Sequence, residues 1–210
     1  MTEEKPDSPF TKLCKDLEHF ETPQWAAEEI LRHEILTDTV LDPCAGSFIL
    51  TRAAGNAGYH VNAWDIHSWS KTHMLDVQGD YLTHENAGGW AKGNTVLMNP
   101  PFSLAEQFVE KSLEYGARKI LCFQRFSWYE GEMDSGRKRG QFWERHPPNR
   151  IYICGSRATC WRHDVPPEER VDAKGREKTT PTSHAWFVWE KGQPAGTLTG
   201  HIYNPEKSKG

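Results

Sequence analysis

The sequence lacks the features that mark several common classes of protein. No apolar run is long enough to span a membrane. The first residues, Met1 to Pro9, are acidic and polar, unlike a signal peptide, so a cytoplasmic protein is expected. The cysteines form no CxxC pair, and their odd number favours reduced thiols over disulfides or a zinc site. They are Cys14, Cys44, Cys122, Cys154 and Cys160.

An excess of positive charge is also missing. The chain has 25 Lys and Arg against 29 Asp and Glu, a formal net charge of -4. A protein that coats nucleic acid stably is globally basic, so that class is excluded. An enzyme that contacts nucleic acid briefly needs only a local basic face. The length of 210 residues and the hydrophobic share of 37% suit one domain with a sizeable core.

Short apolar segments alternate with helical patterns along the chain. Strands are expected over 39–42, 61–65, 74–81, 95–98 and 119–123. Helices are expected over 13–20, from Thr22-Pro23 through Leu31, over 49–57 and over 104–115. This alternation predicts an α/β domain with a mostly parallel sheet. Two later strands, 150–154 and 184–189, have no helix between them and could pair antiparallel at the sheet edge.

The remaining segments predict the domain organisation. A single domain is expected over 13–200, with a disordered segment over 1–12 and a flexible end over 201–210. Two stretches, 127–149 and 165–183, fit no regular element. Loops of this length in a compact domain are usually functional or disordered.

The tetrapeptide Asn99-Pro100-Pro101-Phe102 directly follows an apolar strand. In open α/β sheets, ligands bind at this end of the strands. An amine conjugated to an aromatic ring is a poor nucleophile, because its lone pair is delocalised. The Asn99 side-chain oxygen and the Pro100 carbonyl can each accept one of its N–H bonds. Adjacent prolines stiffen the turn, and Phe102 can stack on a base. The alternative interpretation is a stiff strand-to-helix turn with an Asn cap.

A second strand-to-helix turn carries Asp42-Pro43-Cys44-Ala45-Gly46. Gly46 permits close approach of a ligand to the backbone, and the following helix offers free N–H groups. The turn is neither GxGxxG nor a P-loop. Asp65 ends the next strand, where a carboxylate can take two ribose hydroxyls, and Asp80-Tyr81 ends the third. Each acidic residue alone is typical of a cap or turn, but their joint spacing favours a nucleotide-like ligand.

Together, these motifs resemble those of the S-adenosylmethionine-dependent amino-methyltransferases of DNA, of the N6-adenine type. The resemblance covers roughly residues 20 to 125. It implies a class I, Rossmann-like methyltransferase fold with a seven-stranded, mostly parallel sheet and a reversed final strand. Segments such as Phe126-Ser127-Trp128-Tyr129-Glu130-Gly131 and Ala185-Trp186-Phe187-Val188-Trp189 also resemble small phage-associated members.

The resemblance implies roles for individual residues. Thr22 and Pro23 would contact the methionine part of S-adenosylmethionine, and Asp42 through Gly46 would form the cofactor loop. Asp65 would bind ribose and Ile66 would pack on the adenine. Asp80 would accept from the adenine amino group, flanked by Tyr81. One position departs from many relatives, which carry a glycine where this chain has Phe48.

Basic and aromatic residues are interleaved between 127 and 162. Such a pattern suits a nucleic-acid groove. It suits equally well a solvated charged loop whose aromatic side chains complete the core. The residues assigned to nucleic-acid binding are Arg137, Lys138, Arg139 and Trp128.

The expected activity is methyl transfer from S-adenosylmethionine to the exocyclic amino group of adenine in duplex or single-stranded DNA, without a metal or a membrane. The expected compartment is the cytoplasm of a bacterial or phage-infected cell. The same tetrapeptide would also serve N4 of cytosine, an RNA base amine or a protein glutamine. A further alternative is an inactive protein of the same fold that only binds DNA.

Overall fold

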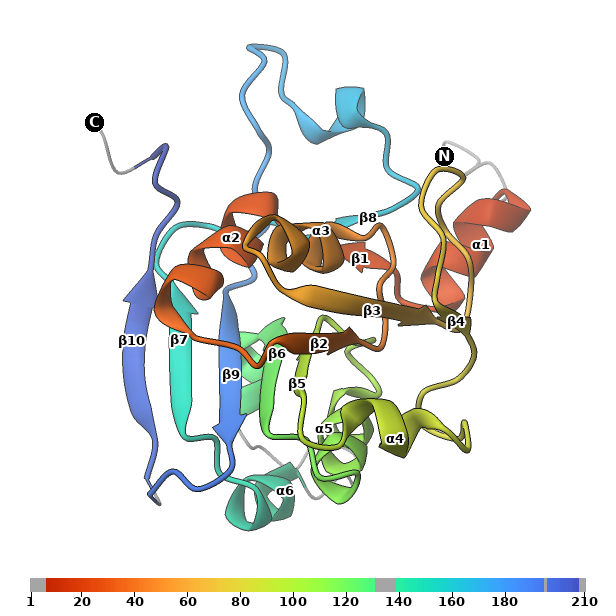
Figure 1. The fold of residues 1–210 in the computed structure, drawn as a ribbon. Coiled ribbons are helices and arrows are strands. Elements are labelled where there is room, and N and C mark those ends of the chain that lie inside the picture. The colour runs from red at the N-terminus through yellow and green to blue at the C-terminus, as the bar shows by residue number, and fades with distance from the viewer. Residues whose placement is uncertain (1–6, 131–138, 195, 208–210) are drawn as a thin grey trace.

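The computed structural model describes residues 7–130, 139–194 and 196–207. Within these residues, eight strands form one sheet in the order β10-β7-β9-β6-β5-β2-β3-β4 (Figure 1). Their bounds are β2 Thr39–Asp42, β3 His60–Asp65, β4 Val77–Gln78, β5 Thr95–Met98, β6 Lys119–Arg125, β7 Arg150–Cys154, β9 His184–Glu190 and β10 Leu198–Ile202. Only β9 runs antiparallel to its neighbours, β6 and β7. The expected α/β fold with a mostly parallel sheet is confirmed.

The edge of the sheet differs from the sequence-based prediction. β7 and β9 do pair antiparallel, but β9 is inserted between β6 and β7. An eighth strand, β10, then pairs parallel with β7 and forms the edge. Most of β10 is exposed, and it carries Gly200 and His201. An edge strand with little burial needs few apolar residues, so its pattern has no strong period.

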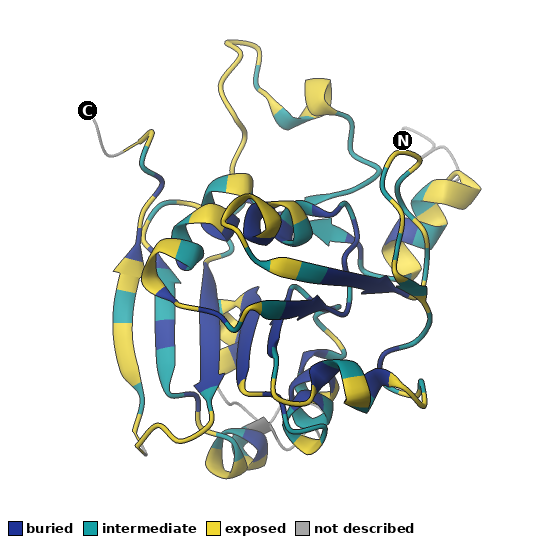
Figure 2. Cartoon of the chain, viewed as in Figure 1, coloured by how far each residue is buried: buried dark blue, intermediate teal, exposed yellow. Residues whose placement is uncertain are grey.

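Helices cover both faces of the sheet. α2 (Gln24–His33) and α3 (Ile49–Asn56) pack on one face. α4 (Ala87–Ala91), α5 (Ala105–Glu114) and α6 (Arg139–Arg145) pack on the other. Successive side chains of β6 point to opposite faces of the sheet. Ile120 therefore belongs to the core beneath α5, and Leu121 to the core beneath α2. The central strands are therefore buried on both faces (Figure 2).

The N-terminal region differs in its boundaries. α1 (Pro9–Asp16) begins inside the segment expected to be disordered, because the Ser8 hydroxyl caps it by accepting from the Thr11 amide. β1 (Phe20–Glu21) occupies the end of the helix expected over 13–20. α2 begins at Gln24, so Pro23, not Thr22, is at the capping position.

Two expected loops contain short elements. The stretch 127–149 includes most of a 3-10 helix, Phe126–Glu130, and α6. The stretch 165–183 holds the 3-10 helix Pro167–Arg170 and projects from the sheet (Figure 1). β8 (Trp161–Arg162) pairs antiparallel with β1 and fastens the base of this projection to the N-terminal segment. Among the residues described, no helix combines the length and apolarity that crossing a bilayer requires.

Candidate active site

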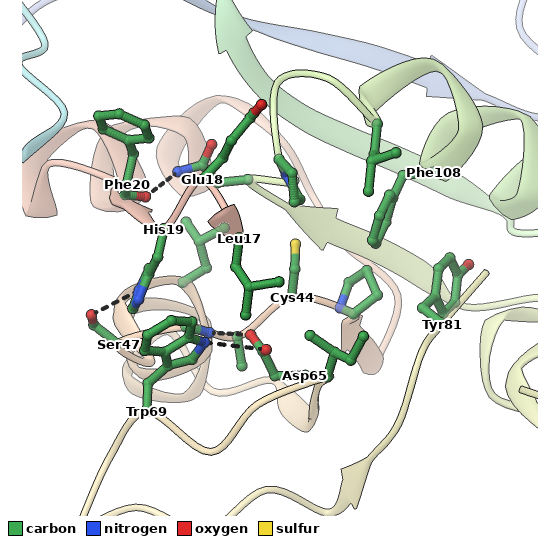
Figure 3. A pocket seen from close by; sticks show the side chains of 18 of the residues that line it. Leu17, Glu18, His19, Phe20, Cys44, Ser47, Asp65, Trp69, Tyr81 and Phe108 are labelled. Carbon is green, nitrogen blue, oxygen red and sulfur yellow. Dashed lines mark hydrogen bonds between the residues drawn. The ribbon is translucent and has the colours of Figure 1, made fainter. Parts of the chain in front are cut away.

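A cavity of about 180 Å³ lies at the carboxyl ends of β2, β3 and β5, beside β1 (Figure 3). Segments far apart in the sequence contribute to its wall. The residues expected to bind cofactor or target that line it are Thr22, Pro43, Cys44, Ala45, Gly46, Asp65, Ile66, Asp80, Tyr81, Asn99 and Pro101. Those that do not line it are Pro23, Asp42, Pro100 and Phe102. The parallel strands thus bring most of the expected residues to one place.

The side-chain amide of Asn99 is held in one orientation. Its Nδ2 donates to the backbone carbonyl of Phe20 at 2.9 Å, as the dashed line to Phe20 in Figure 3 shows. A carbonyl oxygen only accepts, so Phe20 selects the amide rotamer that turns Nδ2 towards β1. This rotamer leaves Oδ1 to accept from a ligand. The sequence alone contains no sign of this contact, because the two residues are 79 positions apart.

The carbonyl of Pro100 is oriented by a residue that the sequence analysis did not single out. Nε2 of Gln124 donates to it at 3.1 Å, and the Gln124 side chain is buried at the end of β6. The carbonyl keeps a second lone pair for another donor. The available signal for Gln124 was its position as a polar residue directly after the apolar run 120–123.

Phe102 lies outside the cavity wall and packs against side chains of the neighbouring strands. Its ring stacks on Phe20, with centroids 5.3 Å apart, and the Arg125 guanidinium carbon lies 4.1 Å from its centroid. The tetrapeptide therefore joins β1, β5 and β6 at one corner of the sheet.

Asp42 supports the cavity loop from behind. Its carboxylate is fully buried and accepts from the Thr51 hydroxyl at 2.9 Å and from the Cys44 amide at 3.4 Å. Burial outweighs these hydrogen bonds and raises the pKa of Asp42 to about 7. Asp42 does not line the cavity, and its side chain contacts the loop and α3 instead.

The backbone conformation at Phe48 is one that glycine adopts more easily than other residues. Its backbone is left-handed, with φ at 61°, a conformation that costs a residue with a Cβ roughly 1–2 kcal/mol. The ring is buried against Ala45 and Ala63 and stacks on His73 with centroids 5.3 Å apart. This burial offsets the strain, so the loop keeps its turn without the glycine.

The Asp65 carboxylate faces the cavity and also organises its rim. Oδ2 accepts from the Gly46 amide at 2.9 Å, and Oδ1 accepts from the His67 amide at 2.9 Å and the Trp69 indole at 3.3 Å (Figure 3). Burial raises its pKa despite these bonds. Ile66 follows with an exposed side chain at the cavity wall.

The third strand end is closed by an Asx turn. Asp80 accepts from the Leu82 amide at 2.9 Å and from the Thr83 hydroxyl at 3.1 Å. Tyr81 is 1% exposed, and its hydroxyl pairs with that of Ser112 at 3.0 Å. Tyr81 is therefore chiefly a core residue whose ring reaches the cavity.

A polar cluster beside the cavity was missed by the sequence analysis. Glu21 binds Ser47 at 3.0 Å, His163 at 2.8 Å and Arg170 at 2.7 Å. Burial alone would raise the pKa of Glu21, but these hydrogen bonds outweigh it and lower the pKa to about 2. Glu21 thus places a stable negative charge at the cavity wall. Its partners come from segments 26 and more positions away, so no local motif marks them.

This cluster does not form a nucleophilic triad. A triad needs the imidazole to bind the hydroxyl with one nitrogen and the carboxylate with the other. Here, Ser47 and Glu21 both contact Nδ1 of His163, at 3.0 and 2.8 Å. His19 stacks on His163 and packs at a tilt against Trp69, and burial lowers its pKa to about 3. The imidazoles therefore pack the rim.

Of the four residues assigned to nucleic-acid binding, the structure describes the side chain of Trp128. Trp128 is 4% exposed and packs in the core against Phe142, Trp143 and Phe187, so the interpretation in which the aromatic side chains complete the core is correct for it. Arg137 and Lys138 lie outside the described residues, and Arg139 begins α6. Other basic side chains of the segment are paired: Arg145 with Glu110, Arg150 with Glu34 and Glu190, and Arg162 with Asp164.

Metal-ligand chemistry is not evident in the part of the chain that the structure describes. No three His, Cys, Asp or Glu side chains there converge to hold an ion.

The sequence matches no protein-family model and no curated protein. Similar solved structures include a type I restriction-modification methyltransferase subunit from Streptococcus thermophilus, with a TM-score of 0.55, 11% identity, and coverage of 83% of this chain and 45% of that one. A second is a predicted O-methyltransferase from Agrobacterium tumefaciens, with a TM-score of 0.53, 10% identity, and coverage of 87% of this chain and 86% of that one. A third is described as a class I S-adenosylmethionine-dependent methyltransferase from Listeria monocytogenes, with a TM-score of 0.51, 11% identity, and coverage of 86% of this chain and 65% of that one. This chain spans less than half of the first of these proteins. The likeness establishes the fold, which is that of the class I methyltransferases.

Proposed function

We propose that this protein transfers the methyl group of S-adenosylmethionine to the exocyclic amino group of adenine in DNA. The proposal rests chiefly on the two acceptors at the end of β5. The Asn99 amide is turned by Phe20, and the Pro100 carbonyl is held by Gln124. A fixed pair of acceptors suits an –NH2 group, which has two N–H bonds to donate.

The side chains of the cavity wall support the proposal that S-adenosylmethionine binds there. The Asp65 carboxylate suits the ribose hydroxyls, the exposed Ile66 side chain suits the adenine face, and Asp80 suits the adenine amino group. Glu21, which stays ionised, suits the ammonium group beside Thr22. When bound, the cofactor supplies a methyl group on a positively charged sulfur, which is open to attack by a nitrogen lone pair.

The residues of the chain act by positioning. Asn99 Oδ1 and the Pro100 carbonyl each accept one N–H of the target amine, which draws its lone pair out of conjugation with the ring. Phe102, which packs on Phe20 and Arg125 beside this corner, is the aromatic side chain nearest in sequence to the two acceptors and is proposed to contact the base. The target base must leave the duplex, or be unpaired already, to reach this corner. Neither acceptor has to change its protonation state, so the chemistry needs no tuned pKa here.

Gly46→Ala is expected to weaken S-adenosylmethionine binding by about tenfold or more, which corresponds to about 1.4 kcal/mol. Gly46 has φ at 51°, and an added Cβ would lie 2.8 Å from Nε2 of His19. His19 is packed between Trp69 and His163, so it cannot yield without disturbing the cavity wall. Isothermal titration calorimetry measures the effect.

Gly58→Ala is the matched control. Gly58 also has a positive φ, at 95°, but nothing lies within 4 Å of its Cβ position, and it does not line the cavity. Both substitutions strain the backbone, and only the first should change cofactor affinity. Equal affinities for the two variants would remove the Gly46 loop from the cofactor site.

Gln124→Glu is expected to lower kcat about tenfold at neutral pH, which is the upper range for the loss of one hydrogen bond. Cofactor affinity should change little. A protonated carboxyl group can donate to the Pro100 carbonyl, whereas an ionised one repels it. Activity of the variant should therefore recover as the pH falls, and Gln124→Leu should show no such recovery. Parallel pH–rate profiles of parent and Gln124→Glu would show that Gln124 does not position the carbonyl.

The choice of DNA draws on the similar structure from Streptococcus thermophilus, which is described as a type I restriction-modification methyltransferase subunit. Transfer of labelled methyl to DNA, RNA and protein, followed by nucleoside analysis, tests it. The expected product is N6-methyladenine. Labelled N4-methylcytosine, RNA or glutamine would reassign the substrate, and label on a ring carbon or ring nitrogen would overturn the mechanism. Cofactor binding without any transfer would indicate an inactive binding protein.

A further inference from the structure

A basic and aromatic cluster lies beside the catalytic turn, and the proposed chemistry does not use it. Arg125 ends β6 and is paired across the sheet with His184, the first residue of β9. β6 neighbours β5, whose end carries the tetrapeptide. The Arg125 guanidinium carbon lies 4.1 Å from the centroid of the Phe102 ring. A cation therefore lies next to the aromatic ring that is expected to contact the target base.

Arg157 brings a second cation to the same corner from the segment after β7. Its side chain is exposed, and Nη1 donates to the Pro181 carbonyl at 2.7 Å, which fixes the guanidinium and leaves its other N–H groups to donate. The buried imidazole of His184 lies near enough to both arginines to sense their charges. Burial, and then the charges of Arg125 and Arg157, lower its pKa to about 4. His184 is thus neutral at pH 7, and the positive charge of the corner comes from the two arginines.

Positive and negative charges lie on opposite sides of the catalytic turn. His184 stacks on Phe123 with centroids 5.3 Å apart, which holds the imidazole against the sheet. On the other side of the turn, Glu18 accepts from the Ser103 amide at 3.1 Å. Glu18 has φ at 48°, so the chain is strained where this carboxylate meets the turn. Positive charge lies on the β6 and β9 side of the turn, and negative charge lies on the β1 side.

We propose that Arg125 and Arg157 form a docking site for the phosphodiester groups that flank the target base. The inference rests on the proposed methyl transfer and names the feature of the substrate that this corner recognises. Guanidinium groups bind phosphate oxygens bidentately, and a base entering beside Phe102 carries a phosphate on either side. A free nucleoside or a glutamine side chain has no phosphate for these cations. The docking site lies apart from Trp128, whose indole is buried. The expected contacts of Arg137 and Lys138 lie outside the described residues.

Binding of a single-stranded oligonucleotide at several salt concentrations tests the site, with fluorescence anisotropy as the readout. The slope of log K against log salt is expected to fall by about 1.4 in the double variant Arg125→Gln, Arg157→Gln, since each phosphate that a cation neutralises contributes about 0.7. The double variant Arg125→Lys, Arg157→Lys keeps both charges and should retain most of the parent's slope. Arg145→Gln is the matched control, since Arg145 is exposed but pairs with Glu110 of α5 on a covering layer of the sheet.

Methyl transfer supplies the second readout. Transfer to the oligonucleotide should fall in the Gln double variant, whereas transfer to deoxyadenosine, which has no phosphate, should equal that of the parent. An unchanged salt slope, or an equal loss of activity with both substrates, would overturn the docking site. If the parent methylates neither DNA nor deoxyadenosine but still binds the oligonucleotide with an arginine-dependent slope, then the proposed function fails and the docking site stands.

Discussion

Asn99→Ala is expected to lower the rate of methyl transfer roughly 10²- to 10³-fold, the scale for removing one preorganised hydrogen-bonding group from a reacting centre. S-adenosylmethionine affinity should change little, because the Asn99 amide is held by the Phe20 carbonyl and its free oxygen is directed to the incoming amine. Single-turnover assays give the rate, and calorimetry gives the cofactor affinity. The two measurements separate a catalytic defect from a folding defect.

Asn86→Ala is the matched control for this substitution. Asn86 is exposed and makes no capping hydrogen bond at the start of α4, so its removal should leave both quantities unchanged. Near-parental turnover in Asn99→Ala would mean that the tetrapeptide is only a stiff turn. A parallel loss of cofactor affinity would place Asn99 in the cofactor site instead.

Asp42→Asn is expected to remove much of the pH dependence of stability between pH 4 and pH 7. Burial raises the pKa of Asp42 from 3.8 to about 7 in the folded protein. Between these values, the unfolded chain ionises Asp42 and the folded protein does not. The stabilising contribution is thus complete below pH 4 and is lost as the pH rises towards 7. A pKa raised from 3.8 to about 7 corresponds to about 4 kcal/mol in the free energy of unfolding.

Urea unfolding of the cofactor-free protein across this range measures the effect as a difference between variant and parent. Asn keeps an acceptor for the Thr51 hydroxyl but cannot ionise, so the slope with pH, not the absolute stability, carries the prediction. Asp38→Asn, at an exposed position, should have the parent's slope. If Asp42→Asn also follows the parent's slope, Asp42 is ionised in the folded protein and the loop is more hydrated than its burial indicates.

Local sequence patterns predicted several elements closely. The strand expected over 150–154 coincides with β7, and that over 95–98 coincides with β5. α5 begins and ends one residue inside the helix expected over 104–115. These elements are set by apolar periods and by flanking turn residues, which lie within a few positions of one another.

Other elements depended on contacts that no local pattern encodes. The insertion of β9 between β6 and β7 is a choice of pairing partner, which the apolar pattern of a single strand does not encode. Trp128 shows the same ambiguity, because an aromatic residue among basic ones suits a core or a groove equally. Only the packing of Phe142 and Phe187 around its indole decides the matter.

For the site itself, the sequence alone determined which residue types lie at the ends of the strands. Parallel strands place their carboxyl ends at one edge, so Asp65, Asp80 and Asn99 had to come together. How each side chain is used depended on the folded arrangement. It turned the Asn99 amide towards β1, placed Gln124 on the Pro100 carbonyl and withdrew Asp42 from the cavity. Hydrogen-bond partners distant in sequence set these orientations, since a polar side chain in a buried site takes whichever partner the fold brings within reach.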